Sequence, residues 1–199
     1  MLDIVIATSN RHKVRELNAL LAVPGIRWHS LAEFPSAPAV RETGRTFEAN
    51  AILKARGVSR ATGRVALADD SGLEVDALHG APGVRSARFA GRHGHDRANH
   101  ERLLRALRGR PPAQRRARYR CVLALATPSG MIAVTRGTWN GRVAERARGR
   151  RGFGYDPIFF LPRVGKTVAQ LPASTKRRLS HRAQAARAMR AVLRRLVKR

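Results

Sequence analysis

At 199 residues, the chain is long enough for one well-cored domain and too short for two ordinary domains with a linker, so we expect a single domain over residues 1–199. No apolar stretch could span a membrane and the first residues do not resemble a signal peptide, which leads us to expect a cytoplasmic protein. The net charge of +27 is typical of nucleic-acid-binding proteins, but the basic residues are mostly arginines spread along the whole chain, as a genomic codon bias also produces.

The first residues predict a strand, a polar turn and a helix. Residues 2–7 are aliphatic, residues 8–10 are polar, and Val14, Leu17 and Leu21 then follow at helical spacing. Such a turn directs backbone N–H groups at whatever lies over the helix start. This arrangement favours an anion.

A second strand with functional residues is expected over residues 65–68, which are wholly apolar. It delivers Asp69 and Asp70 at its carboxyl end, where open α/β sheets bind ligands. The other elements that the patterns predict are a strand around 26–29, a helix over 47–55, a helix over 98–107 with Asp96 as candidate N-cap, two strands over 119–126 and 131–136, and a basic amphipathic helix over 185–196. We therefore expect an α/β fold with a mixed sheet.

The adjacent carboxylates Asp69 and Asp70 are costly near a core unless something compensates their charge. A divalent cation such as Mg²⁺ would do so with oxygen ligands, and it would also bridge a polyphosphate. A simple turn over residues 69–72, in which Asp and Ser bond the backbone, explains the same residues equally well. The motif alone leaves both interpretations open.

Polar and cationic residues near three predicted helix starts favour the metal interpretation. Together they supply acidic ligands and cations that position and neutralise a polyphosphate. They are Thr8, Asn10 and Lys13 in the first group, Glu42 and Lys54 in the second, and Lys176, His181 and Arg182 in the third.

The segment 152–160 contains the second informative motif. Glycines on either side of Phe153 let the backbone approach a ligand closely, and the ring is placed to stack on a base. Phe159 and Phe160 are expected to pack in the core. The single cysteine, Cys121, is expected to be a buried, inert thiol.

With these motifs in view, the chain resembles the bacterial dITP/XTP pyrophosphatases, relatives of inosine triphosphate pyrophosphatase. The matching blocks occur in family order across nearly the whole chain. They are residues 7–10 with Lys13, residues 42–44 with Phe47 and 50–55, residues 68–73, residues 81–83 with 86–88, residues 152–159, and residues 180–182.

The resemblance implies hydrolysis of a nucleoside triphosphate between the α and β phosphates, which gives a monophosphate and pyrophosphate. It also implies a requirement for Mg²⁺ and a preference for the non-standard purine nucleotides dITP, ITP and XTP, whose incorporation into DNA and RNA is thereby prevented. The implied fold is an elongated mixed α/β structure with two lobes around a central substrate cleft. The implied assembly is a homodimer, with no membrane and no nucleic acid as partner.

The site residues are carried over in the same way. Asp70 resembles the residue that activates water and helps to hold the metal, with Glu42 as a second metal ligand and Asp69 in support. Thr8, Ser9, Asn10, Lys13, Lys54 and Ser71 would hold the triphosphate and sugar, Phe153, Gly154, Tyr155 and Asp156 would cover the base, and Lys176, His181 and Arg182 would read its 6-keto edge.

Two alternatives stay open. A pyrophosphatase for modified or pyrimidine nucleotides, of the septum-formation-inhibitor type, shares the reaction, but residues 153–156 and 180–182 speak against it. A basic RNA- or DNA-binding module without catalysis would explain the charge.

Overall fold

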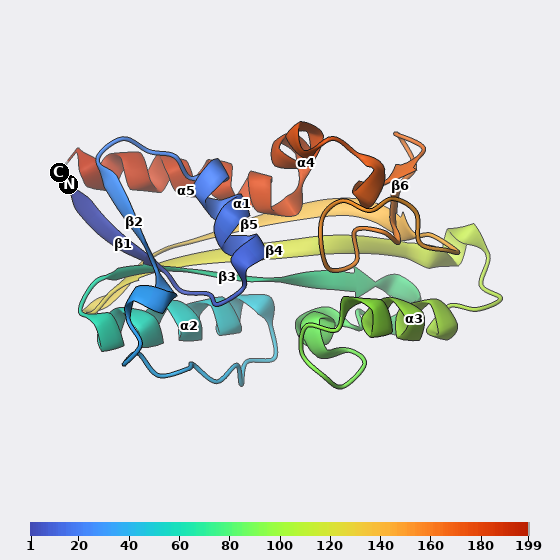
Figure 1. Cartoon of the computed structure of the whole chain (residues 1–199), viewed down its shortest axis with the longest axis horizontal. Helices are drawn as coiled ribbons and strands as arrows, with labels where there is room; N and C mark the ends of the chain where they lie inside the picture. Colours follow the sequence, from blue (N-terminus) through green and yellow to red (C-terminus); the bar gives the residue numbers. More distant parts are fainter. Residues whose placement is uncertain (199) are drawn as a thin grey trace. The chain divides into compact units, whose positions relative to one another are not determined.

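Seven strands form one sheet in the order β2-β1-β3-β4-β5-β6-β7 in the computed structural model, which describes residues 1–198 (Figure 1). β1 pairs in parallel with β2 and β3, whereas β6 pairs antiparallel with β5 and β7. The prediction of an α/β fold with a mixed sheet is therefore confirmed. The strands are β1 (Leu2–Ile6), β2 (Ile26–Ser30), β3 (Val65–Val75), β4 (Arg116–Thr127), β5 (Gly130–Val143), β6 (Phe159–Leu161) and β7 (Lys166–Thr167).

The chain divides into two compact units. Unit 1 contains Met1–Asp70, Cys121–Gly137 and the chain from Arg182 onward, and unit 2 contains Ser71–Arg120 and Thr138–His181. Each unit has its own hydrophobic cluster. That the two units make one domain with two lobes stays a prediction.

Both faces of the sheet are buried in unit 1. Alternate strand residues such as Ile4 and Leu67 pack against α1 (Arg11–Leu20) and α5 (His181–Val197), while Val5 and Ala66, which face the other way, are also fully buried. Figure 1 shows α2 (Phe47–Thr62) on the side of the sheet opposite to α1 and α5. Burial on both faces explains why residues 65–68 are continuously apolar rather than alternating.

The helices of unit 1 begin where local side chains cap them. The Asn10 side chain accepts hydrogen bonds from the backbone N–H groups of His12 and Lys13, and the Thr46 hydroxyl accepts one from Ala49. The predicted helices over 14–21 and 47–55 are thus confirmed. None of the helices over residues 1–198 is long and apolar enough to cross a membrane.

Strand β3 differs from the prediction. It does not end at Asp69 but continues through Asp69, Asp70 and Ser71 to Val75, so the interpretation of residues 69–72 as a simple turn is wrong. β1 pairs with β3 only as far as Ile6, opposite Leu67, so the two carboxylates lie just beyond the end of this parallel ladder. Within the strand, a Cβ at Gly72 would lie 2.3 Å from the Ser86 Oγ, so only glycine fits there.

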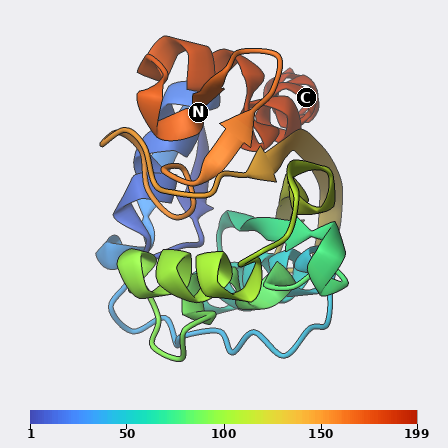
Figure 2. The same cartoon turned by 90° about the vertical axis from the view of Figure 1, so that its right-hand side faces the viewer.

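In unit 2, helix α3 (Asp96–Ala106) lies beside the glycine-rich segment around Gly154 (Figure 2). The prediction that Asp96 caps this helix is wrong. Asp96 lies within the first turn, and its carboxylate accepts a hydrogen bond of 2.7 Å from the Gly154 N–H instead of one from the helix. The remaining helix of this unit is α4 (Ala173–Leu179).

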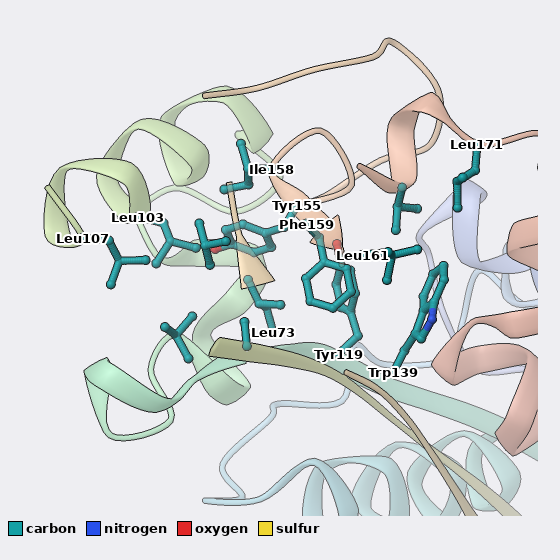
Figure 3. Close-up of a cluster of buried hydrophobic side chains, with 14 residues drawn as sticks. Leu73, Leu103, Leu107, Tyr119, Trp139, Tyr155, Ile158, Phe159, Leu161 and Leu171 are labelled. Carbon is teal, nitrogen blue, oxygen red and sulfur yellow. The ribbon is translucent and has the colours of Figure 1, made fainter. Parts of the chain in front are cut away.

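Aromatic rings dominate the hydrophobic cluster of unit 2 (Figure 3). The Phe159 ring lies 4.6 Å from that of Tyr119 and 6.1 Å from that of Trp139, in both cases tilted. Phe159 is fully buried as predicted, whereas Phe160 is only partly buried. Leu103 from α3 completes the contact between helix and sheet.

A pH-dependent ion pair ties the first strands of unit 1 together. His29 contacts Asp3 at 2.8 Å and Glu33 at 2.9 Å, and these hydrogen bonds raise its pKa above the ordinary value of 6.5. The same bonds lower the pKa of Asp3 and of Glu33 from 3.8 and 4.5. The ion pair therefore stabilises the fold fully below pH 6.5, where His29 is charged, and this stabilisation is lost as pH rises through the raised pKa of His29. It also weakens in acid below pH 4.5, where Glu33 and then Asp3 take up protons.

We expect His29→Gln to lower the thermal unfolding midpoint more at about pH 5.5 than at about pH 8.5, because only the lower pH charges the imidazole that the substitution removes. Circular dichroism melting at both values measures the difference. An equal loss at the two values would show that the ring acts through packing alone.

Candidate active site

Asp69 is the most deeply buried acid of unit 1, with 0% exposure. One of its oxygens lies 2.6 Å from the Lys13 ammonium, and the other accepts hydrogen bonds from the Arg182 guanidinium at 2.8 Å and the Cys121 thiol at 3.2 Å. Burial alone would raise the pKa of Asp69, but Arg182 and Lys13 outweigh it and hold the pKa well below 3.8. Asp69 is therefore a permanently charged centre of the core.

Cys121 is buried as predicted. Its pKa is raised well above 9.0 by burial and by the neighbouring Asp69 charge. A thiol in this state is a weak nucleophile, so the expectation of an inert cysteine is confirmed.

Asp70 lies beside Asp69 but in a different environment. Its Oδ1 accepts a hydrogen bond of 3.0 Å from the Lys54 ammonium, whereas its buried Oδ2 has no hydrogen-bond partner among residues 1–198. Burial raises the pKa of Asp70, Glu42 adds to this effect, and Lys54 and Lys13 oppose it. The carboxylate is thus more basic than usual and has an oxygen available for a ligand.

Lys54 connects the acids of this group. Its ammonium donates to the Glu42 carboxylate at 2.9 Å, to the Asp69 backbone carbonyl at 2.8 Å and to Asp70 at 3.0 Å. An ammonium has three N–H donors, so these contacts use all of them. Burial would lower the pKa of Lys54, but Asp70 and Glu42 raise it, and the residue stays charged.

The residues predicted to hold Mg²⁺ fit that ion. No group of three or more His, Cys, Asp or Glu side chains that could hold a metal occurs among the described residues. Mg²⁺ does not need one, because it is commonly bound by one or two carboxylates together with the phosphates of a substrate. Asp70 and Glu42, both within 3.0 Å of the same ammonium, and the unpartnered Asp70 Oδ2 match this requirement.

The polar turn before α1 lies in unit 1 with these acids. The Thr8 hydroxyl accepts a hydrogen bond from the Asn10 N–H, and the Asn10 side chain caps the helix, while Ser9 is exposed. A capped helix start of this kind favours a phosphate. Ser71, predicted to serve the same substrate, belongs to unit 2 and is half-buried.

Arg182 and Lys176, predicted together to read the base, fall in different units. Arg182 belongs to unit 1, is 2% exposed, and donates to Asp69 and, at 2.5 Å, to the Glu16 carboxylate. Glu16 was not predicted as part of the site. Nothing in its helical context marks it in the sequence, because its partner is 166 residues away along the chain.

Predicted base-contacting residues are brought together in unit 2 around the buried carboxylate of Asp156. It accepts hydrogen bonds from the Lys176 ammonium at 2.5 Å and the Phe153 N–H at 3.0 Å. The same ammonium lies 4.6 Å from the centre of the Phe153 ring, within cation–π range. Phe153, Asp156 and Lys176 therefore form one connected group, which we call the Asp156 cluster.

The neighbouring Gly154 and Tyr155 are anchored differently. The Gly154 N–H is bound by Asp96, and its φ of 58° is one that glycine adopts readily. The Tyr155 hydroxyl donates to the Ser86 carbonyl at 2.9 Å, and burial raises the pKa of this buried phenol. The Tyr155 side chain packs in the core, so it anchors the segment around Gly154 to the core.

His181 is buried in unit 2, where its ring stacks on Tyr119 with centroids 4.5 Å apart and planes 6° from parallel. The Tyr119 hydroxyl in turn donates to Asp156 at 3.2 Å. The sequence analysis did not single out Tyr119. The only available signal was a tyrosine within a buried strand, whose hydroxyl needs a partner.

The comparisons with known proteins agree with one another. The model of the Ham1 family matches residues 4–192. The chain is 54% identical over 185 residues to the dITP/XTP pyrophosphatase of Geobacillus kaustophilus, and the match covers 93% of this chain and 91% of that one. It is 47% identical to the dITP/XTP pyrophosphatase of Desulforamulus reducens, with 98% of this chain and 97% of that one covered. Among solved structures, a HAM1 protein from Coxiella burnetii superposes with a TM-score of 0.90 at 41% identity, covering 98% of this chain and 100% of that one. The Ham1 protein of Staphylococcus aureus gives a TM-score of 0.87 at 41% identity, with 96% and 98% covered.

The contrast between the two acids predicts opposite responses to the same substitution. Asp69→Asn leaves the buried Lys13 and Arg182 charges without their shared partner and should lower the free energy of unfolding by about 3 kcal/mol or more. Asp70→Asn removes a carboxylate with one unpartnered oxygen, and the Lys54 ammonium keeps its ion pair with Glu42. The free energy of unfolding should therefore change by no more than about 1 kcal/mol. Urea unfolding of the two variants measures both values, and equal losses would contradict this division of roles.

Proposed function

This chain belongs to the Ham1 family, and on that premise we propose that it hydrolyses non-standard purine nucleoside triphosphates, namely dITP, ITP and XTP, to the monophosphate and pyrophosphate. The reaction removes these nucleotides before they enter DNA and RNA. The observation that carries the proposal is the buried and unpartnered Asp70 Oδ2 among lysines, because such an oxygen suits a cation-bridged polyphosphate.

The triphosphate end of the substrate is assigned to unit 1. Asp70 and Glu42 would hold Mg²⁺, which when bound neutralises polyphosphate charge and polarises the phosphoanhydride. Lys13 and Lys54 supply further positive charge, and the capped start of α1 at Asn10 offers backbone N–H groups to phosphate oxygens. Thr8 and Ser9 extend the same turn toward the phosphates and sugar, with Ser71 following Asp70 in the chain.

Asp70 is assigned the proton transfer. Its Oδ2 has no hydrogen-bond partner among residues 1–198, and Lys54 fixes its Oδ1 so that Oδ2 keeps one direction. Water adds across the bond between the α and β phosphates, the bridging oxygen leaves with pyrophosphate, and the water proton passes to Asp70. Asp69 and Arg182 are assigned positioning roles, because their charged groups are bonded to each other in the core.

The base end is assigned to the Asp156 cluster and to His181. Phe153 offers a ring for stacking, and the Lys176 ammonium is a pure donor beside it. A 6-keto oxygen accepts a hydrogen bond from such a donor, whereas the 6-amino group of adenine presents a donor of its own. Gly154 and Tyr155 hold the segment in which Phe153 lies.

We expect pyrophosphate release from dITP and XTP to exceed that from dATP and dGTP, to stop when a chelator removes divalent cations, and to return with Mg²⁺. A coupled phosphate assay after pyrophosphatase treatment measures this. Equal rates with dATP, dGTP and dITP would refute the substrate assignment while leaving the reaction type intact.

Asp70→Asn should lower kcat by at least about 100-fold, because it removes the base and one metal-holding charge together. Asp76→Asn is the matched control, since this exposed carboxylate pairs only with an arginine of unit 2 and should leave the rate unchanged. Activity retained in Asp70→Asn would overturn the assignment of roles.

We also propose that the protein works as a homodimer in the cytoplasm. Light scattering coupled to size exclusion should then report twice the chain mass of 21.9 kDa at micromolar concentration. A mass equal to one chain would refute the dimer.

A further inference from the structure

Tyr119 is the residue of unit 2 that contacts two predicted base-reading side chains at once. It lies on β4, is 6% exposed, and belongs to the aromatic cluster with Phe159 (Figure 3). Its hydroxyl reaches Asp156, and the face of its ring stacks on His181.

The hydroxyl contact fixes the carboxylate of Asp156. One carboxylate oxygen accepts from Tyr119 at 3.2 Å, and the other accepts from the Phe153 N–H and the Lys176 ammonium. Donors on both oxygens prevent the carboxylate from rotating about its terminal bond. The direction in which Asp156 holds Lys176 over the Phe153 ring therefore depends on Tyr119.

The ring contact fixes His181. A parallel stack with centroids 4.5 Å apart restricts rotation of the imidazole about its χ2 bond. Tyr119 is itself held in place, since Phe159 packs against its ring at 4.6 Å in the buried cluster. The orientation of His181 is thus transmitted from the rigid core rather than from a surface loop.

We propose that Tyr119 is the positioning residue that sets purine selectivity, by holding Asp156 with Lys176 through its hydroxyl and His181 through its ring. The proposal rests on the function proposed above. It assigns no chemistry to Tyr119, which acts only through the side chains it orients. The triphosphate end is assigned mainly to residues of unit 1, whereas these contacts lie within unit 2, so selectivity should change with little loss of turnover.

Tyr119→Phe removes the hydroxyl and keeps the stacking ring. We expect the KM for dITP to rise roughly three- to tenfold, as the loss of one buried hydrogen bond predicts, with kcat within about twofold. The ratio of kcat/KM for dITP over dATP should fall by a similar factor, because dATP lacks the 6-keto oxygen that Lys176 would bind. Competitive inhibition by pyrophosphate, which probes the phosphate end alone, should be unchanged. Chromatographic measurement of the nucleoside monophosphate product supplies all four values, because it can be made in the presence of added pyrophosphate.

Tyr119→Leu also removes the ring and should reduce the dITP to dATP ratio further than Tyr119→Phe. The matched control is Trp139→Phe, which loses packing in the same cluster without touching Asp156 or His181. It should lower the melting temperature and leave the ratio unchanged. A ratio that falls equally in the control would overturn the proposal in favour of general packing.

The two proposals fail in distinguishable ways. If the unsubstituted protein releases no pyrophosphate from dITP, the proposed function fails and the role of Tyr119 falls with it. If that protein is active and selective while Tyr119→Phe shows the same KM and the same ratio, only the role of Tyr119 is refuted.

Discussion

Two carboxylates occupy neighbouring positions inside a β-strand, and much of unit 1 is arranged around the cost of burying them. An unpaired buried charge is destabilising by several kcal/mol, so each carboxylate must find cations or take up a proton. Asp69 is fully compensated by Lys13 from α1 and Arg182 from α5. Asp70 is compensated only in part, by Lys54 from α2. The first acid therefore stabilises the fold, while the second keeps the reactivity that a stable core would normally remove.

Unit 2 uses buried polar groups in a different way. Asp156, Tyr119 and His181 are all buried, yet they are connected by hydrogen bonds and ring stacking at the edge of an aromatic cluster. Polar networks of this kind define one arrangement of side chains, because every alternative leaves a buried group without its partner. The purine-reading role that we propose for this group needs such rigidity, since discrimination depends on donors with a fixed orientation.

The sequence predicted what is local and missed what is distant. The strand, the turn and the Asn10 cap were predictable because they depend on residues within a few positions of one another. The continuation of β3 through Asp69 was not, because the cation that makes it tolerable, Arg182, lies 113 residues further along the chain. Tyr119, which belongs to no motif, was missed for the same reason, because its partner Asp156 lies 37 residues further along the chain. The assignment of Arg182 to the base stays a prediction. The fold class came from the apolar patterns, and the family and the division of roles between the two acids came from the ordered motifs. The structure adds the contacts that set the two carboxylates apart.

The charge balance around Asp69 also bears on how such a chain can evolve. Asp69, Lys13 and Arg182 come from three separate segments. The Asp69 carboxylate pairs with both cations in the protein interior. A lineage that loses one of them inherits an uncompensated charge in its core, so the three positions are constrained to persist or to change together. Exposed arginines elsewhere are under no such constraint and are free to drift. A protein can in this way acquire a net charge of +27 over the whole chain while its interior keeps the same arrangement of paired charges.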